Sequence, residues 1–247
     1  MILINLESIL LNIYLSHFYI MCGIIACLNC KNINEILIEG LHQLQNRGYD
    51  SCGISTIYEN KFKIEKYAST ENTQGLEKLS SNLNFKIYDI GIAHTRWATH
   101  GIKNDINAHP HIDYYNKVCL VHNGIITNYI ILKKFLVEKG FEFYGETDTE
   151  VIANLISFYL NDNEPFKAVK LAINKLEGSW GLVIMIISKG NSLFVSKNGS
   201  PLLLGKSENG ILIGSEISAF CNRSISIISL NDGDILEINS EHINNVD

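Results

Sequence analysis

Proline, basic clusters and long apolar runs are all scarce in this chain of 247 residues. Three prolines are too few for a proline-rich linker, and no apolar run reaches the roughly 18 residues that a membrane-spanning helix needs. Acidic residues outnumber basic ones by 26 to 20, which gives a net charge of −6 and no basic surface for nucleic acid or anionic lipid. We therefore expect a protein that acts neither on a membrane nor on nucleic acid.

The motifs of nucleotide and metal binding are also missing. Neither GxxxxGK[ST] nor GxGxxG occurs. Cys27 and Cys30 have the spacing of half a zinc site, but no second pair follows, and His109 and His111 are better explained as parts of a turn. The six cysteines show no repeated spacing, which is typical of a reduced, cytoplasmic protein. We expect no metal and no organic cofactor.

What is present is material for one core, because 46% of the residues are hydrophobic and 19% are charged. Hydrophobic periodicity predicts helices and strands that come in clusters instead of alternating strictly, which favours an α+β sandwich in one domain. The predicted helices are 34–45, 127–139, one opened by the capping box at 147–150, and one beginning at Pro165. The predicted strands are 22–26, 86–96, 118–121, 182–187, 193–195, 202–204, 211–213 and 225–228.

The first 21 residues are apolar and differ from the rest of the chain. Glu7 is their only charge, and they have neither the basic start nor the small-residue cleavage site of a secretory signal. Two interpretations stay open, an unused upstream translation start or a short segment that is removed. In both, the mature chain begins at Cys22 and the domain is 22–247.

Cys22 is the leading candidate for a nucleophile. Removal of Met21 before this small residue would leave a thiol beside a free α-amino group, whose ordinary pKa of about 7.7–8 lies near that of the thiol, about 8.5. Such a residue carries nucleophile and base together. A buried cysteine on a first strand is the simpler alternative, and a papain-like pairing of one cysteine with one histidine has no local motif to support it.

Three other places have residues that suit amide chemistry. Arg96, at a predicted strand end, could clamp a carboxylate with two parallel hydrogen bonds, or be a solvated charge. Asn123 and Gly124 follow a predicted core strand directly, where they could form an oxyanion hole or an ordinary Asn-Gly turn. Asp148 could receive an ammonium group, or be the acidic residue that a helix start favours anyway.

Seven motifs resemble the glutaminase domain of glutamine–fructose-6-phosphate aminotransferases, which are class II glutamine amidotransferases. In chain order they are MCGII at 21–25, RGYDSCG at 47–53, HTRWATHG at 94–101, NAHPH at 107–111, HNGIITN at 122–128, ETDTEVI at 146–152 and GSPLLLG at 199–205. The resemblance implies the four-layer αββα sandwich of the N-terminal-nucleophile hydrolases. Cys52 and Glu216 depart from the family's usual residues, and we expect little effect from either.

The resemblance also implies a role for each candidate residue. Cys22 would attack the side-chain amide of L-glutamine, and Asn123 and Gly124 would form the oxyanion hole. Arg96 would hold the α-carboxylate and Asp148 the α-ammonium. The loop at Trp97, Thr99 and His100 would help to bind the substrate.

In the family, the released ammonia passes to a sugar-phosphate isomerase half and becomes the amino group of glucosamine 6-phosphate. From this resemblance we expect the chain to end with the glutaminase domain, without the isomerase modules, and to act with a separate isomerase domain or subunit as its partner. Two alternatives remain: a glutaminase subunit for another acceptor, such as the phosphoribosylamine or asparagine systems, and an inactive glutamine-binding regulatory module that keeps residues 1–21.

Overall fold

Two antiparallel sheets form the centre of the molecule. The computed structural model describes residues 22–97 and 102–239. One sheet has seven strands in the order β11-β9-β10-β1-β4-β2-β3, and the other has five in the order β12-β8-β7-β6-β5. The strands are β1 (Gly23–Leu28), β2 (Ser51–Tyr58), β3 (Lys61–Ala68), β4 (Ile90–Arg96), β5 (His111–Ile112), β6 (Val118–Ile126), β7 (Gly178–Ile186), β8 (Ser192–Asn198), β9 (Leu203–Lys206), β10 (Ile211–Gly214), β11 (Ser226–Ser229) and β12 (Ile235–Asn239).

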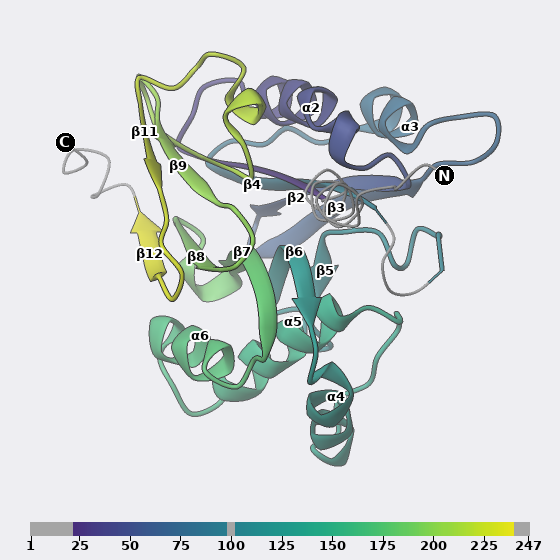
Figure 1. The fold of residues 1–247 in the computed structure, drawn as a ribbon, viewed down its shortest axis with the longest axis vertical. Helices are drawn as coiled ribbons and strands as arrows, with labels where there is room; N and C mark the ends of the chain where they lie inside the picture. Colours follow the sequence, from purple (N-terminus) through teal and green to yellow (C-terminus); the bar gives the residue numbers. More distant parts are fainter. Residues whose placement is uncertain (1–21, 98–101, 240–247) are drawn as a thin grey trace, which may run out of the picture.

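Helices cover the outer faces of both sheets (Figure 1). The helices α2 (Ile33–Gln43) and α3 (Gly75–Asn82) lie on the seven-stranded sheet, and α4 (Tyr129–Glu138), α5 (Asp148–Tyr159) and α6 (Pro165–Ile173) lie on the five-stranded sheet. Three short 3₁₀ turns occupy Gln45–Arg47, Ile187–Lys189 and Ile217–Phe220. The layers therefore run helix, sheet, sheet, helix, which is the predicted four-layer sandwich. No helix in the described ranges is long and apolar enough to cross a bilayer.

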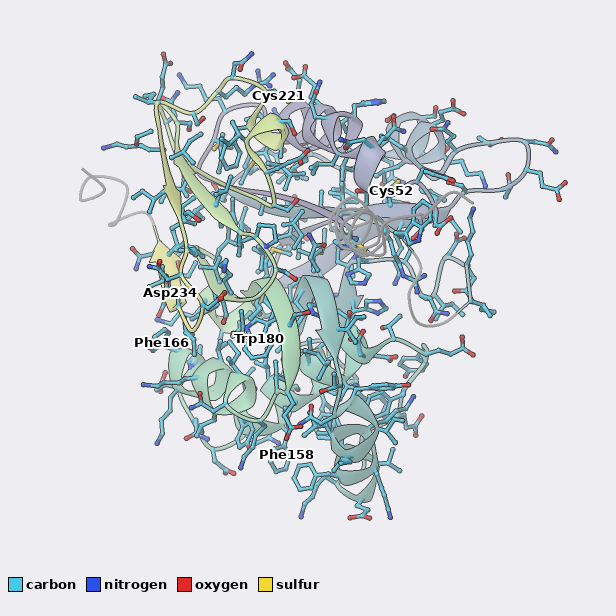
Figure 2. The ribbon with its side chains drawn as sticks, in the orientation of Figure 1. Cys52, Phe158, Phe166, Trp180, Cys221 and Asp234 are labelled. Atoms are coloured by element: carbon cyan, nitrogen blue, oxygen red, sulfur yellow. The ribbon has the colours of Figure 1, made fainter. Side chains whose placement is uncertain are left out.

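Three apolar clusters hold these layers together. One lies between the sheets and includes Ile24 of β1 and Val183 of β7. A second fills the space between the seven-stranded sheet and its helices and contains Cys52, and a third does the same for the five-stranded sheet and contains Trp180 (Figure 2). Both faces of each central strand are covered, which explains why β1 and most of β7 are buried at every position and have no polar alternation.

Local signals predicted the boundaries of several elements, but α3, β5 and β12 were not predicted. Pro165 is the first residue of α6, and Gly140 follows α4 with a φ of +85°. The strand predicted at 86–96 begins only at Ile90. The β2–β3 hairpin was not predicted, because its turn residues Glu59 and Asn60 are not the usual glycine, although both adopt left-handed φ values of 49° and 59°.

The largest difference concerns Asn123 and Gly124. They were predicted to follow a strand, but β6 continues through both to Ile126, and they pair with Gly181 and Trp180 of β7. The Asn-Gly turn is therefore excluded. These two residues are held on one side by their pairing with β7, because the edge strand β5 pairs only with Cys119 and Leu120 of β6.

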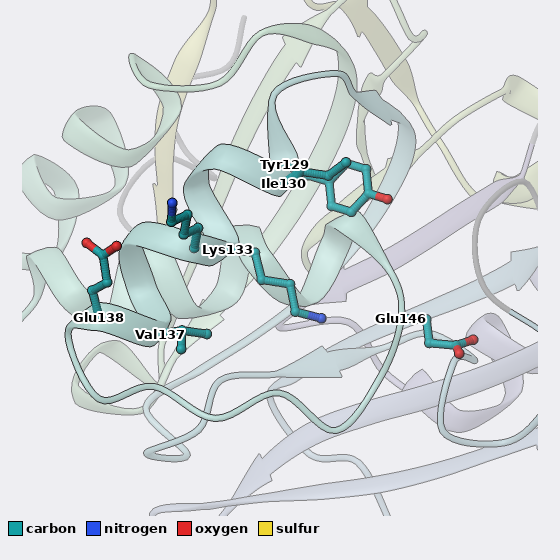
Figure 3. A pocket seen from close by; sticks show the side chains of 7 residues that line it. Tyr129, Ile130, Lys133, Val137, Glu138 and Glu146 are labelled. Carbon is teal, nitrogen blue, oxygen red and sulfur yellow. The ribbon is translucent and has the colours of Figure 1, made fainter.

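Helix α4 is less buried than its sequence predicted. Leu136 is its one fully buried residue, whereas the side chains of Ile130 and Ile131 are 66% and 72% exposed. One side of the helix lines a shallow surface groove, which Glu146 also lines from a neighbouring segment (Figure 3). This groove lies outside the pocket that collects the predicted site residues.

Candidate active site

The predicted site residues converge on one small pocket. It forms where the start of β1, the end of β4, the middle of β6 and the start of α5 meet. Its lining consists of Cys22, Arg96, Trp97, His109, His122, Gly124, Thr147, Asp148 and Thr149. Asn123 reaches the same place through a hydrogen bond to Cys22. Thr99 and His100, predicted to help bind the substrate, lie outside the described residues.

Cys22 is placed by the pairing of β1 with β4. Gly23 lies opposite Thr95, so the residue before β1 comes beside the residues that end β4. The backbone N–H of Trp97 donates to Cys22 Sγ at 3.2 Å. Burial raises the pKa of the Cys22 thiol, and the Trp97 N–H and the charge of Arg96 lower it only in part. The thiol is therefore protonated at neutral pH, and a base must remove its proton before it can attack.

Arg96 is the last residue of β4, and its buried side chain lines the pocket. The alternative that it is a solvated surface charge is therefore wrong. Burial lowers the pKa of this guanidinium, whereas the neighbouring Cys22, Asp50 and Asp148 raise it. A buried guanidinium in a pocket is suited to a carboxylate, because its fork of N–H groups matches the two carboxylate oxygens.

The close approach of the chain at residue 48 supports this strand end. A Cβ atom on Gly48 would lie 2.7 Å from the carbonyl carbon of Arg96 and 2.8 Å from the nitrogen of Trp97. Any side chain there would displace the backbone that positions both residues. The glycine of the RGYDSCG motif thus helps to position Arg96 and Trp97, although it does not line the pocket itself.

Asn123 and Gly124 are aligned by their strand. The side-chain Nδ2 of Asn123 donates to the carbonyl oxygen of Cys22 at 2.7 Å. Gly124 has a φ of +133°, and a Cβ atom on it would lie 2.1 Å from the carbonyl oxygen of Ser179. Only glycine fits there, both for its backbone conformation and for the space available. An amide N–H₂ group and a glycine N–H at this point are the donors that an oxyanion hole uses.

Asp148 is the first residue of α5, and it does more than begin a helix. Its Oδ2 accepts the backbone N–H of Ile126 at 2.8 Å, and its Oδ1 accepts the Thr149 hydroxyl at 3.4 Å. Thr147 caps the helix by accepting the N–H of Glu150 at 3.3 Å. The carboxylate therefore ties α5 to the end of β6 and lines the pocket, where a cationic group of a ligand would find a buried anion.

Sequence reasoning missed a group of four buried histidines, of which His109 and His122 line the pocket. His94 stacks on His109, with ring centroids 4.0 Å apart, and His109 meets His111 edge to face at 4.7 Å. The Thr149 hydroxyl lies 3.1 Å from Nδ1 of His122 and 3.5 Å from Nε2 of His109.

Burial lowers the pKa of all four rings, so they are neutral at pH 7. Three of the motifs, HTRWATHG, NAHPH and HNGIITN, each supply at least one of these rings, which was the available signal. Neither these histidines nor any other three or more His, Cys, Asp or Glu residues within 22–97 and 102–239 are arranged so that they could hold a metal ion.

A family model for the glutamine amidotransferase domain matches residues 94–222, which contain the end of β4 with Arg96, all of β6 and all of α5, but not Cys22. The chain belongs to the glutamine amidotransferase family. Among curated relatives of this amidotransferase domain, a glutamine–fructose-6-phosphate aminotransferase (isomerizing) from Pyrococcus horikoshii is 41% identical over 217 residues, covering 87% of this chain and 36% of the relative. The protein of the same name from Clostridium perfringens is 39% identical over 225 residues, with 90% and 36% covered. The domain thus spans about a third of the length of these relatives.

Solved structures identify the same fold. The glutamine phosphoribosylpyrophosphate amidotransferase of B. subtilis, complexed with ADP and GMP, superposes with a TM-score of 0.75 and 26% identity, covering 89% of this chain and 48% of that one. A structure titled as the allosteric regulatory enzyme of purine biosynthesis gives a TM-score of 0.76 at 25% identity, with 89% and 47% covered. The amidotransferase domain has the predicted sandwich of the N-terminal-nucleophile hydrolases.

Proposed function

We propose that this protein hydrolyses L-glutamine to glutamate and ammonia, with Cys22 as the nucleophile. One observation carries the proposal: a thiol, a buried guanidinium, a buried carboxylate and a pair of oxyanion donors all meet at a single pocket. Each of these groups matches one part of glutamine or of its reaction. The match to glutamine–fructose-6-phosphate aminotransferases supports the same activity.

Substrate binding follows from the two charged walls of the pocket. Arg96 holds the α-carboxylate of glutamine and Asp148 holds its α-ammonium, so the amino acid is gripped at its main-chain end. Its side-chain amide then extends toward Cys22. Trp97 lines the same wall, and Thr99 and His100 belong to the segment that follows it and are proposed to contribute to binding.

The reaction begins with removal of residues 1–21, which converts the amide nitrogen of Cys22 into a free amine. The amine accepts the thiol proton, and the sulfur attacks the amide carbon of glutamine. The negative oxygen of the tetrahedral intermediate is stabilised by Asn123 Nδ2 and the Gly124 N–H. The ammonium form of the Cys22 amine then protonates the leaving nitrogen, which departs as ammonia and leaves a thioester. Water attacks the thioester, glutamate leaves, and the thiol is regenerated.

The acceptor that we propose for the ammonia is a sugar phosphate. The curated relatives are aminotransferases named for fructose 6-phosphate, and they extend well beyond the region that this chain matches. The domain 22–247 is therefore the proposed nitrogen-donor part of glucosamine 6-phosphate synthesis, acting with an isomerase domain or subunit. Transfer of ¹⁵N from amide-labelled glutamine to fructose 6-phosphate in the presence of such an isomerase tests this role. No transfer with any isomerase partner would leave another acceptor as the explanation.

Two measurements test the glutaminase itself. Intact-mass analysis of the protein from its native host should give a chain that begins at Cys22, and this chain should release glutamate and ammonia from glutamine. Cys22→Ala should abolish the release and leave glutamine binding intact. Cys221→Ala is the matched control, since this partly buried cysteine lies in the seven-stranded sheet's helical layer, away from the pocket, and should keep full activity. A mass that begins at Met1, without activity, would favour the glutamine-binding module.

A further inference from the structure

His94 lies on β4, two residues before Arg96, with its side chain fully buried. Its Nε2 atom is 3.0 Å from Oδ1 of Asn123 and 3.1 Å from the backbone carbonyl oxygen of His122. It does not line the pocket, and neither the substrate-binding nor the chemical steps described above use it. It contacts one of the groups that do, the side-chain amide of Asn123.

The backbone carbonyl of His122 decides which nitrogen of the His94 ring carries the hydrogen. A carbonyl oxygen only accepts, so the Nε2 atom that faces it must be the donor. Burial lowers the pKa of His94 to about 3, so the ring is neutral and holds one hydrogen, which is the one on Nε2. The ring therefore presents an N–H to Asn123 as well.

That N–H in turn decides the orientation of the Asn123 amide. The amide must turn its oxygen to His94, since its N–H₂ group would meet another donor there. Its Nδ2 then points the opposite way and donates one hydrogen to the carbonyl oxygen of Cys22 at 2.7 Å. The second hydrogen of Nδ2 is left for the pocket side, where the oxyanion of the proposed reaction forms.

Packing alone does not explain a histidine at this position. Its other ring nitrogen, Nδ1, is buried and has no hydrogen-bond partner among the described residues. An orphaned buried acceptor costs free energy that an apolar side chain of similar volume would avoid. The ring's stacking on His109 would be available to a phenylalanine too. What phenylalanine lacks is the Nε2 donor.

We propose that His94 is a positioning residue of the glutaminase reaction: its Nε2–H locks the Asn123 amide in the orientation that aims Nδ2 at the oxyanion. The inference rests on the proposed function. The carbonyl oxygen of His122 fixes the tautomer of the His94 ring, and this tautomer fixes the orientation of the Asn123 amide. Without this ring, only the hydrogen bond from Nδ2 to the Cys22 carbonyl oxygen holds the amide, and a turned-over amide would present its oxygen, which repels the developing negative charge.

The test compares His94→Leu, which removes the donor, with His94→Gln, whose side-chain N–H₂ can occupy the place of Nε2. Both are made in the full-length gene and purified in the form that the host produces. His94→Leu should lower kcat for glutamine hydrolysis about 100-fold, the lower end of the loss typical of a missing oxyanion donor, with KM changed less than about threefold. His94→Gln should recover kcat to within about tenfold of the parent. Ile92→Val, a buried change on the same strand between the sheets, is the control and should keep the parental kcat.

Two readouts separate this role from a structural one. Calorimetric binding of glutamine should be equal in Cys22→Ala and in Cys22→Ala combined with His94→Leu. Nitrogen NMR should show the Nε2–H tautomer of His94, and the Asn123 side-chain amide signals should shift in His94→Leu and not in Ile92→Val.

Parental kcat in a folded His94→Leu variant, or equal losses in the Leu and Gln variants, would overturn the inference while the glutaminase stands. A parent without glutaminase activity would overturn the proposed function. In that case the NMR comparison alone decides whether His94 orients Asn123, and unchanged Asn123 signals would refute it.

Discussion

At the scale of single residues, the pocket depends on groups that are buried and therefore carry unusual properties. The Cys22 thiol is protonated at neutral pH because burial raises its pKa, so the proposed reaction needs a base, for which we propose the amine of Cys22 itself. Asp148 is 5% exposed and Arg96 is 3% exposed. Each can therefore pair with an opposite charge on a ligand at a place that is poorly accessible to water. Electrostatic interactions in such surroundings are stronger than on the surface.

Asp148→Asn tests whether the carboxylate holds an ammonium. The amide of asparagine keeps the size of the side chain and removes its charge, so glutamine binding should weaken by about 2–5 kcal/mol if the pair is desolvated. The measurement is calorimetric titration of glutamine into the Cys22→Ala background. Asp162→Asn, an exposed change beyond the end of α5, should leave the affinity unchanged. If Asp148→Asn changes the binding free energy of glutamine by nearly zero, the carboxylate does not hold the ammonium and serves only at the start of the helix.

Gly124→Ala tests the constraint at the oxyanion site. The new Cβ would meet the carbonyl oxygen of Ser179 at 2.1 Å in a backbone conformation that alanine disfavours, so we expect a loss of about 3 kcal/mol in unfolding free energy and loss of activity. Gly140→Ala is the control, because Gly140 also has a positive φ but has open space around it, and it should cost about 1 kcal/mol. Urea denaturation measures both, and equal losses would mean that the clash with Ser179 is relieved easily.

At the scale of elements, the residues at helix ends predicted where helices begin and end better than the apolar patterns predicted where strands end. The capping box at the start of α5 is half correct. The Thr147 hydroxyl accepts the Glu150 N–H as predicted, but the Glu150 carboxylate accepts the N–H groups of Tyr144 and Gly145, both at 2.8 Å. The carboxylate therefore orders the turn that leads into the helix, and with it the approach to Asp148.

Thr147→Ala tests this start of α5. Loss of the cap should cost about 1 kcal/mol of unfolding free energy, and somewhat more because Nε2 of His111, 3.1 Å from the hydroxyl, loses its buried partner as well. Thr147→Ser keeps the hydroxyl and should stay within about 0.5 kcal/mol of the parent. Chemical denaturation gives both values. If the serine variant loses as much as the alanine variant, the methyl group and not the cap is what stabilises the helix start.

The strand that carries Asn123 and Gly124 shows why strand ends were harder to predict. The apolar run of β6 stops at Val121, and the sequence of His122, Asn123 and Gly124 is typical of a turn. The strand continues because β7 supplies backbone partners for each of these residues up to Ile126. Pairing between segments nearly 60 residues apart decided the matter, and local propensity does not contain that information.

At the scale of the whole molecule, the site brings together residues from three of the four layers. Cys22 and Arg96 come from the seven-stranded sheet, Asn123 and Gly124 from the five-stranded sheet, and Asp148 from a helix of the outer layer (Figure 1). The apolar cluster between the sheets holds the first two pairs in register. Any change that separates the sheets should therefore reduce activity before it unfolds either sheet.

The buried histidines predict how stability depends on pH. Burial lowers the folded-state pKa of His94 to about 3, below its ordinary 6.5, so between these values the unfolded chain binds the proton and the folded chain does not. The contribution of this ring to the free energy of unfolding is fully present above pH 6.5. It decreases on acidification by at most about 1.4 kcal/mol per pH unit. His109, His111 and His122 act in the same direction.

Urea denaturation of the parent and of His94→Gln from about pH 8.5 to about pH 4.5 measures this slope. The variant has one titrating ring fewer, so its stability should fall less steeply by up to about 1.4 kcal/mol per pH unit below pH 6. The two curves should run parallel above pH 7. Identical slopes throughout would mean that His94 takes up a proton in the folded state as easily as in the unfolded one.

The sequence by itself determined the fold class, four of the five helices and the types of residue proposed for the site, because these follow from local periodicity, capping groups and motifs; α3 was not predicted. Only the tertiary structure decided that Asn123 and Gly124 belong to a strand, that Arg96 and Asp148 face one pocket, and that His94 orients Asn123. Each of these depends on contacts between segments that lie far apart in the chain. At such contacts a backbone carbonyl or a neighbouring ring allows a side chain only one orientation in which its hydrogen bonds are made.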